Sequence, residues 1–466
     1  MKNVQQEILT TEDTFVSVVP TRDNTLKVQN CTEDTGERVQ LCKLHEFLTT
    51  FELTKITTLH LQNCEISQLP RDVQKLNLKR LVLNHNQLKE VPSCLYSGLE
   101  ALQVLDLSHN LIKTFDVEPA CSRNIVSLKL SHNKIYNFPH WIMTCHCPNL
   151  IEIDYSANFL TSVSVARKLT LKKITMNNSQ LLDVDFEFFK RISTLEYLDI
   201  GNTNCKLTKQ ENEFKDITQL FVKTKWKELK VLKLDHILVS IIPDGLFWIV
   251  SLTELHLSHC ELSWIPPEVQ YLTNLEVLDV SHNSICGIPK ELAILPKLRI
   301  VKASFNLVSS VDDFTNELEI LDLYHNELET FPNSIERIKF VDLEQNYVDM
   351  SLYKTYGEKR DSFRQMLDDG RADGPRVPPT EVPSSDDDRL SSEGSVCGND
   401  DFYDADLVDE TWDYEEPNVN VGRVRNPEIT PSDDEWTGRE EIIIREKRTT
   451  KPWIDVNEDW IFSDVE

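Results

Sequence analysis

Residues Leu275–Pro289, LEVLDVSHNSICGIP, carry the pattern that decides the fold of this 466-residue chain. The segment reads L-x-x-L-x-L-x-x-N-x-L-x-x-L-P when Val and Ile are counted as equivalent to Leu. In a strand, the aliphatic Leu278 and Val280 face one side, and the polar residues beside them face the other. Asn283 follows, and its amide can bond to the backbone of a chain that turns inward. The pattern predicts a short strand, a turn and a return segment.

This spacing recurs along most of the chain and predicts thirteen stacked coils. Successive copies lie 20 to 25 residues apart, except for one step of 34 residues. One coil cannot bury its apolar edge alone, so the copies must share a core. We therefore predict an α/β solenoid, a curved horseshoe with a parallel sheet on its concave face. The residues at the asparagine position are Cys64, Asn86, Asn110, Asn133, Asn158, Ser179, Thr203, Ile237, Cys260, Asn283, Asn306, Asn326 and Asn346.

The domain organisation follows from where this pattern begins and ends. Terminal coils must cover the open ends of the core, so caps are expected on both sides of the array. The stretch from Glu381 to Glu416 holds fourteen acidic residues and one basic residue, a composition that predicts disorder. The predicted regions are an N-terminal flank or cap with a degenerate repeat (1–55), the repeat array (56–350), a C-terminal capping helix (351–370) and a disordered acidic tail (371–466).

One repeat is longer than the others. Between Thr203 and Ile237 there are about ten extra residues, in which Phe214, Ile217 and Leu220 recur at helical intervals. This predicts a longer amphipathic helix on the convex side of that repeat.

Charge and cysteine content narrow the expected surroundings. The formal net charge is −28, and residues 351–466, with 31 acidic and 14 basic residues, account for −17 of it. Such acidity argues against nucleic acid as a ligand. The eleven cysteines are scattered singly, the first residues do not resemble a signal peptide, and no apolar run could span a bilayer. The cytoplasm or the nucleus is the expected location, without membrane insertion.

The sequence also lacks the patterns that catalysis requires. The glycines lie too far apart for a phosphate-cradling loop. Cys145 and Cys147 could begin a zinc site, but no second cysteine or histidine pair lies at ligand spacing. We therefore predict a protein that is not an enzyme, with no catalytic, cofactor or metal site. Seven histidines directly precede the asparagine position, where a structural role is expected over metal binding or pH sensing: His85, His109, His132, His236, His259, His282 and His325.

The predicted concave face carries carboxylates, amines and hydroxyls in mixed order, which suits a folded protein partner better than a polyanion. Phe305 and Tyr324, in adjacent repeats, are the expected hot spot. The alternative is a solvated face without a fixed partner. The candidate partner-binding residues are Lys233, His256, Asp279, Ser281, Lys302, Phe305, Asp322 and Tyr324, and the tail adds Trp412, Trp436, Trp453 and Trp460 as anchors for a second partner or for the protein's own groove.

The array resembles the intracellular leucine-rich repeat proteins whose 23-residue repeats end in Leu-Pro, including Ras-pathway scaffolds and phosphatase-regulatory types. The resemblance covers about two thirds of the chain and implies a horseshoe whose concave face is a docking surface. It favours a scaffold or adaptor with a protein partner on that face. The alternatives are a regulatory or substrate-recognition subunit of a phosphatase or ubiquitin ligase, and autoinhibition by residues 371–466.

Overall fold

The computed structural model describes residues 9–11, 14–16 and 25–29, and residues 56–376 with short gaps. All of them belong to one unit, Met1–Pro383. The rest of the N-terminal flank, the tail from residue 377 and its four tryptophans lie outside the described residues. The gaps are 145–146, 161, 164–168, 182, 185–186, 204–210, 223–225, 331–332, 349–354 and 368–369.

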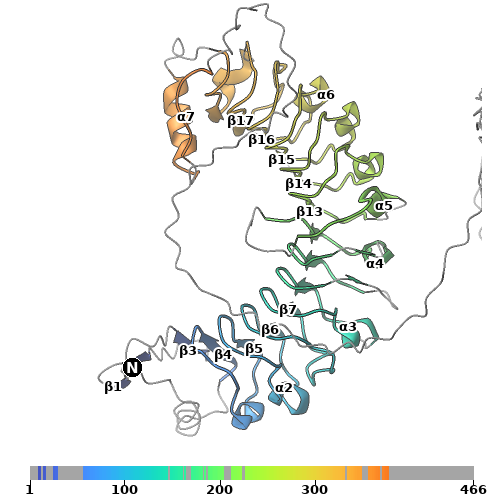
Figure 1. Ribbon diagram of the computed structural model, residues 1–466, viewed down its shortest axis with the longest axis vertical. Helices are drawn as coiled ribbons and strands as arrows, with labels where there is room; N and C mark the ends of the chain where they lie inside the picture. The colour runs from blue at the N-terminus through green and yellow to red at the C-terminus, as the bar shows by residue number, and fades with distance from the viewer. Residues whose placement is uncertain are drawn as a thin grey trace, which may run out of the picture. The chain divides into compact units, whose positions relative to one another are not determined.

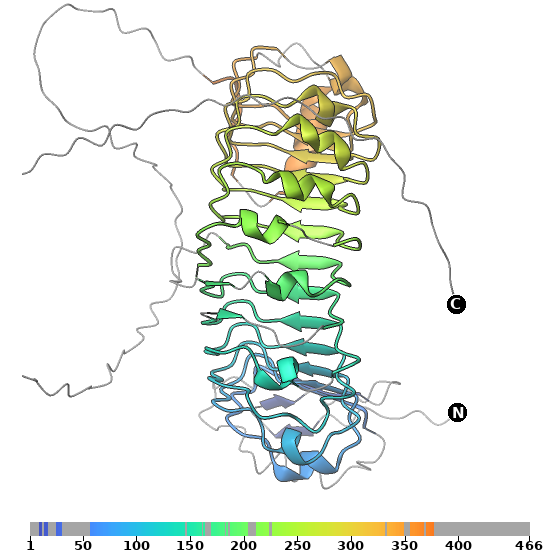
Figure 2. The same ribbon diagram turned by 90° about the vertical axis from the view of Figure 1, so that its right-hand side faces the viewer.

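One parallel sheet of fourteen short strands forms the inner side of the array (Figures 1 and 2). Each repeat contributes one strand. From Arg80 onward, the central aliphatic residue of each strand is buried and pairs with the equivalent residue of the next, as Leu278 does with Val301. The predicted α/β solenoid is thereby confirmed. The strands are β3 (Thr25–Gln29), β4 (Thr58–Gln62), β5 (Arg80–Val82), β6 (Val104–Asp106), β7 (Ser127–Lys129), β8 (Glu152–Asp154), β10 (Lys173–Thr175), β12 (Tyr197–Asp199), β13 (Val231–Lys233), β14 (Glu254–His256), β15 (Val277–Asp279), β16 (Ile300–Lys302), β17 (Ile320–Asp322) and β18 (Phe340–Asp342).

Short helices return the chain along the outer side of the array (Figure 1). Prolines such as Pro266 and Pro289 directly precede them, because the fixed φ of proline suits a helix start. The helices are η2 (Arg71–Lys75), α2 (Cys94–Ser97), α3 (His140–Thr144), α4 (Glu187–Lys190), α5 (Thr218–Phe221), η3 (Asp244–Trp248), η4 (Pro267–Tyr271), α6 (Lys290–Ala293) and η5 (Asn333–Arg337). Outside the main sheet, β1 (Leu9–Thr11) pairs with β2 (Thr14–Val16), and β9 (Ser162–Val163) with β11 (Asp183–Val184).

Where an asparagine follows a strand, its side chain ties two successive repeats together. Asn283 Oδ1 accepts hydrogen bonds from the backbone N–H groups of Cys260 and Leu262, at 2.9 and 3.0 Å. Its Nδ2 donates to the carbonyls of Leu257 and Val280, at 2.9 and 2.8 Å. A turn that enters the core would otherwise leave these backbone groups without partners. The side chain therefore satisfies backbone groups of the preceding repeat as well as of its own repeat.

In the longest repeat, the structure corrects the predicted position of this asparagine. Asn212, and not Thr203, accepts hydrogen bonds from the N–H groups of Ser179 and Leu181, at 3.0 and 2.9 Å, and donates to the carbonyl of Met176 at 2.8 Å. We call the asparagines that bond successive turns in this way the ladder asparagines. The extra residues of this repeat therefore lie between the end of β12 and its ladder asparagine, Asn212. The predicted longer convex helix is wrong, because α5 has only four residues.

Helix α7 (Tyr356–Arg364) covers the C-terminal end of the sheet and packs against β18. Tyr356 and Phe363 are buried, and the Tyr356 hydroxyl accepts a hydrogen bond from the N–H of Leu343 at 2.9 Å. The helix shields the apolar edge that a final coil would otherwise expose to water. It ends at Arg364, before the predicted boundary at residue 370.

Candidate functional site: the concave face

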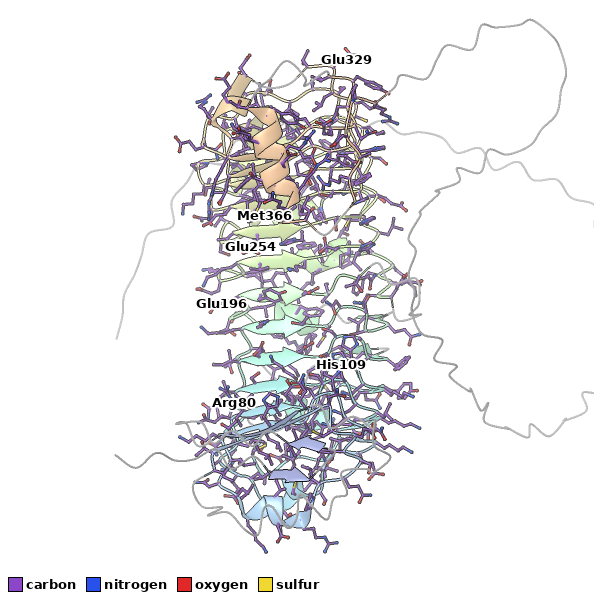
Figure 3. The ribbon with its side chains drawn as sticks, turned by 90° about the vertical axis from the view of Figure 1, so that its left-hand side faces the viewer. Arg80, His109, Glu196, Glu254, Glu329 and Met366 are labelled. Atoms are coloured by element: carbon purple, nitrogen blue, oxygen red, sulfur yellow. The ribbon has the colours of Figure 1, made fainter. Side chains whose placement is uncertain are left out.

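The third residue of each strand from β13 to β17 faces the concave side, and we call these residues the middle row. They are direct neighbours across consecutive strands. The pairing of β13 to β17 places Lys233 beside His256, His256 beside Asp279, Asp279 beside Lys302, and Lys302 beside Asp322. Figure 3 looks onto this face. Residues far apart in sequence are thus gathered in one line, with adjacent strands about 4.8 Å apart.

Neighbouring side chains hold the centre of this row in place. The ammonium of Lys302 lies 3.6 Å from Asp279 Oδ2, and Asp279 Oδ1 accepts a hydrogen bond of 3.1 Å from the N–H of Ser281. Nε2 of His256 lies 3.6 Å from Glu254 Oε2 and makes no hydrogen bond. Charges of opposite sign therefore alternate along the row from Lys233 through Asp279 to Lys302, and the last two are in contact.

A second row on the same face was missed by the sequence analysis. The first residue of each strand lies two positions before the middle row and faces the same side, because side chains alternate. In four consecutive strands this residue is apolar and half-buried: Val277, Ile300, Ile320 and Phe340. The period of two in the sequence already places these apolar residues on the concave face, although only the polar positions were predicted as binding residues. An apolar row therefore runs beside the charged one.

Phe305 belongs to an edge of the sheet and not to the strand rows. It occupies the position of the histidines, with a positive φ of 54°, and its ring stacks on His282 at 4.3 Å between centroids. The ring of Tyr324 lies 5.3 Å away in an edge-to-face arrangement. The two aromatic residues are thus in contact, as their adjacent repeats suggested, but Phe305 forms part of the histidine stack.

Histidines before the ladder asparagine stack face to face along this edge, opposite the edge that carries Arg80 and Glu254 (Figure 3). Ring centroids are 3.9 to 4.1 Å apart. Burial and the two neighbouring imidazoles lower the pKa of His109 to about 4, and likewise the pKa of His259. His109 and His259 are therefore neutral near pH 7. The first stack contains His85, His109 and His132, and the second contains His236, His259, His282 and Phe305.

The last two predicted residues of the concave face are not exposed. Asp322 and Tyr324 are 2% and 6% exposed, because residues 371–376 lie over them. The guanidinium of Arg371 donates hydrogen bonds of 2.8 Å to both oxygens of Asp322. The beginning of the predicted tail is therefore bound to the array. The accessible part of the predicted site is reduced to the strands from β13 to β16.

The negative charge at this end of the concave face explains why residues 371–376 bind there. Asp322 and Asp342 are direct neighbours across β17 and β18, and no lysine stands between them. Two adjacent carboxylates repel each other at this spacing. Arg371 also donates to Asp342 Oδ2, at 3.2 Å, so one guanidinium bridges both carboxylates. Elsewhere in the row, as between Asp279 and Lys302, the neighbouring repeat supplies the positive charge.

No metal-binding geometry occurs among the residues that the structure describes, where no three or more His, Cys, Asp or Glu side chains converge suitably. The stacked imidazoles present parallel rings, so their nitrogens do not point at a common centre. In the same part of the chain, no helix is long and apolar enough to cross a membrane.

The comparison with protein families agrees with the observed repeat. The profile of the family described as "Leucine rich repeat" matches residues 54–112, 76–135 and 250–308. Fibromodulin of Oryctolagus cuniculus is 33% identical over 132 residues, which cover 28% of this chain and 83% of that one. The chain belongs to the leucine-rich repeat family. Domains of this family are generally protein-interaction modules, so a binding role is supported for this leucine-rich repeat protein.

Two further relatives are similar to this chain over about a third of its length. Lumican of Gallus gallus is 31% identical over 153 residues, 32% of this chain and 42% of that one. The leucine-rich repeat-containing G-protein coupled receptor 5 of Xenopus tropicalis is 33% identical over 161 residues, 33% of this chain and 17% of that one. Fibromodulin, lumican and leucine-rich repeat receptors are non-enzymatic binding proteins.

These relatives overturn the expected location. Fibromodulin and lumican are secreted proteoglycans of the extracellular matrix, and the receptor is a membrane protein. The expected cytoplasmic or nuclear location is therefore wrong, and the relatives point to an extracellular or membrane location. The resemblance to leucine-rich repeat proteins is supported, whereas the narrower resemblance to intracellular scaffolds is not. The expectation rested on the scattered cysteines, the first residues and the short apolar runs, which report on the compartment only indirectly.

Solved structures share the fold. A leucine-rich repeat protein of Leptospira interrogans superposes with a TM-score of 0.53 at 24% identity, covering 63% of this chain and 73% of that one. An internalin of Listeria monocytogenes superposes with a TM-score of 0.50 at 18% identity, covering 64% and 84%. At these identities the likeness concerns the solenoid alone.

Proposed function

We propose that this leucine-rich repeat protein is a non-enzymatic adaptor that holds a folded protein on its concave face, between β13 and β16. The observation that carries the proposal is the pairing of an apolar row with a row of alternating charge. Apolar residues such as Val277 and Ile300 supply the burial that drives association. The charges of Lys233, Asp279 and Lys302 supply orientation and selectivity.

Two features support a protein partner over other ligands. The face carries both signs of charge, so it does not offer the positive field that a polyanion requires. The strand backbone also holds the rows rigidly, so binding does not have to order a mobile surface. The tail tryptophans Trp412, Trp436, Trp453 and Trp460 remain a predicted second binding segment.

Affinity purification from the native tissue, with mass spectrometry, tests the proposal. The variant Lys233→Glu plus Lys302→Glu reverses both positive charges of the accessible row and should lose the principal partner. The control variant, Lys290→Glu plus Lys297→Glu, makes the same charge change on the outer side of the array, where both side chains are exposed. It should recover the partner as the wild type does.

Equal recovery by all three proteins would contradict a partner on this face. Recovery of a phosphatase or ubiquitin-ligase catalytic subunit would favour the alternative of a regulatory subunit. A chain that ends after Arg376 separates the contribution of the tail, because the tryptophan segments are then missing while the described array is complete.

A further inference from the structure

Residues 371–376 lie along the ends of β17 and β18 as a short peptide held by its backbone. The N–H of Ala372 donates to the hydroxyl of Tyr324 at 3.0 Å, and the N–H of Gly374 donates to Glu344 Oε2 at 2.7 Å. The carbonyl of Gly374 accepts a bond of 3.0 Å from the N–H of Gln345. This is the way in which an extended peptide ligand docks on a strand surface.

The side chain of Arg371 fills a complete guanidinium site. Its nitrogens donate to both oxygens of Asp322 at 2.8 Å and to Asp342 at 3.2 Å. The guanidinium carbon lies 4.8 Å from the ring centroid of Tyr324 and 5.7 Å from that of Phe363. Two hydrogen bonds from different nitrogens to the two oxygens of one carboxylate, with aromatic rings nearby, match the planar fork of arginine and not the single ammonium of lysine.

The segment differs from helix α7 in how it is attached. Helix α7 is anchored by the buried aromatic rings of Tyr356 and Phe363. In contrast, residues 372–376 bury no large apolar side chain, and Ala372 and Pro375 are exposed. Apolar burial, which fixes a permanent cap, is therefore missing from this segment.

The surface beneath the segment also differs from a solenoid core. It consists of three carboxylates and one phenol, from Asp322, Asp342, Glu344 and Tyr324, and all four side chains are buried. Removing the segment would expose polar groups and one aromatic ring to water, and the aliphatic core would stay closed under the strands and α7. A polar and aromatic surface of this kind is typical of a binding site.

We infer that Asp322, Tyr324 and Asp342 form an arginine-recognition site on the concave face, which residues 371–376 occupy as a displaceable intramolecular ligand. The external ligand it takes is an extended protein segment that carries an arginine. The inference rests on the proposed function only in assigning that segment to the concave-face partner. Because residues 371–376 are part of the same chain, they compete for the site at an effective concentration of the order of mM. An external segment must bind tightly enough to displace them.

Amide hydrogen exchange on the wild-type full chain tests whether the segment is displaceable. The N–H groups of Ala372, Gly374 and Arg376 should exchange about 100-fold faster than that of Leu343, which the Tyr356 hydroxyl holds under α7. Equal protection of both sets would mean that the segment opens only together with the array, and would overturn the inference.

A peptide titration of the full chain tests the chemistry of the site. The probe is acetyl-Arg-Ala-Asp-Gly-Pro-Arg-amide, which reproduces residues 371–376, and its control has lysine in place of the first arginine. The Arg371→Ala variant should bind the probe about tenfold more tightly than the wild type, because the competing guanidinium is gone. Adding Asp322→Asn to that variant should abolish binding, and the lysine control should bind weakly to every protein.

The outcomes separate the two proposals. Failure of folded Arg371→Ala to bind the probe, or equal binding of both peptides, overturns the arginine site and leaves the adaptor proposal standing. Probe binding with unchanged partner recovery by Lys233→Glu plus Lys302→Glu has the opposite meaning: the arginine site holds and the adaptor proposal fails.

Discussion

Arg371 donates two hydrogen bonds to the carboxylate of Asp322, each 2.8 Å long, across 49 residues of sequence. Both side chains are almost fully buried, at 6% and 3% exposure. Burial raises the pKa of Asp322, and the hydrogen bonds from Arg371 oppose that change. The pair therefore decides how far this end of the concave face is open, while Arg364 and Arg360 of α7 neutralise the neighbouring carboxylates of Asp342 and Glu344.

The first prediction concerns the strength of this contact. Arg371→Ala should lower the free energy of unfolding by roughly 1–3 kcal/mol, the range for a lost charged hydrogen bond, because water can reach the carboxylates once the segment leaves. Phe363→Ala, in helix α7, should cost about 3–5 kcal/mol, because it empties a buried aromatic site. Urea unfolding of both variants measures the difference. A larger loss for Arg371→Ala would show that residues 371–376 are a permanent cap.

The second prediction concerns the ladder asparagine of the longest repeat. Asn212→Ala should destabilise the array by roughly 2–4 kcal/mol, because it leaves several buried backbone groups without partners. Thr203→Ala should cost less than about 1 kcal/mol, since its side chain does not take part in the ladder. Asn283→Ala, in a regular repeat, is the positive control. Thermal unfolding of the three variants measures these losses of stability. Similar losses for Thr203→Ala and Asn212→Ala would contradict the assignment of Asn212 as the ladder asparagine.

The third prediction concerns acid. The pKa of His109 and of His259 falls from 6.5 to about 4 on folding, first through burial and then through the neighbouring imidazoles. The unfolded chain therefore binds protons more readily, so the stability contributed by the neutral rings is complete above pH 6.5 and is lost as the pH falls towards 4. Urea midpoints between pH 7.5 and 4 should show this loss.

The chain itself supplies the control for that experiment, because Phe305 takes the histidine position and stacks on His282. His259→Phe should keep the stack and lose less stability between pH 7 and pH 4 than the wild type. NMR titration should place the lowest imidazole pKa values at the middle of each stack. An unchanged acid response in the variant would rule out the stacked histidines as its source.

The fourth prediction concerns close packing between outer helices. A Cβ added at Gly245 would clash with the backbone carbonyl oxygen of Phe221, so Gly245→Ala must force α5 and η3 apart. We expect a loss of roughly 1–3 kcal/mol. At Gly287 nothing lies within 4 Å of the added carbon, so Gly287→Ala should change stability by less than about 0.5 kcal/mol. Calorimetry of the two variants compares them directly.

The sequence by itself determined the repeat and its core. The spacing around Leu278, Val280 and Asn283 was sufficient for the parallel sheet, because each coil contacts only its neighbours and the same local rule is applied along the array. The row of concave residues from Lys233 to Lys302 followed from that register. The apolar row of Val277 and Ile300 was equally accessible through the period of two, and was overlooked.

Only the tertiary structure decided the irregular parts. Asn212 replaced Thr203 in the ladder because hydrogen-bond geometry, and not the count of residues, selects the amide that reaches the turn. Asp322 and Tyr324 were covered because Arg371 lies 49 residues beyond Asp322, and no local periodicity relates the two positions. Repetition is a short-range property that spacing can encode, whereas the closing of an end depends on contacts between distant segments that occur once.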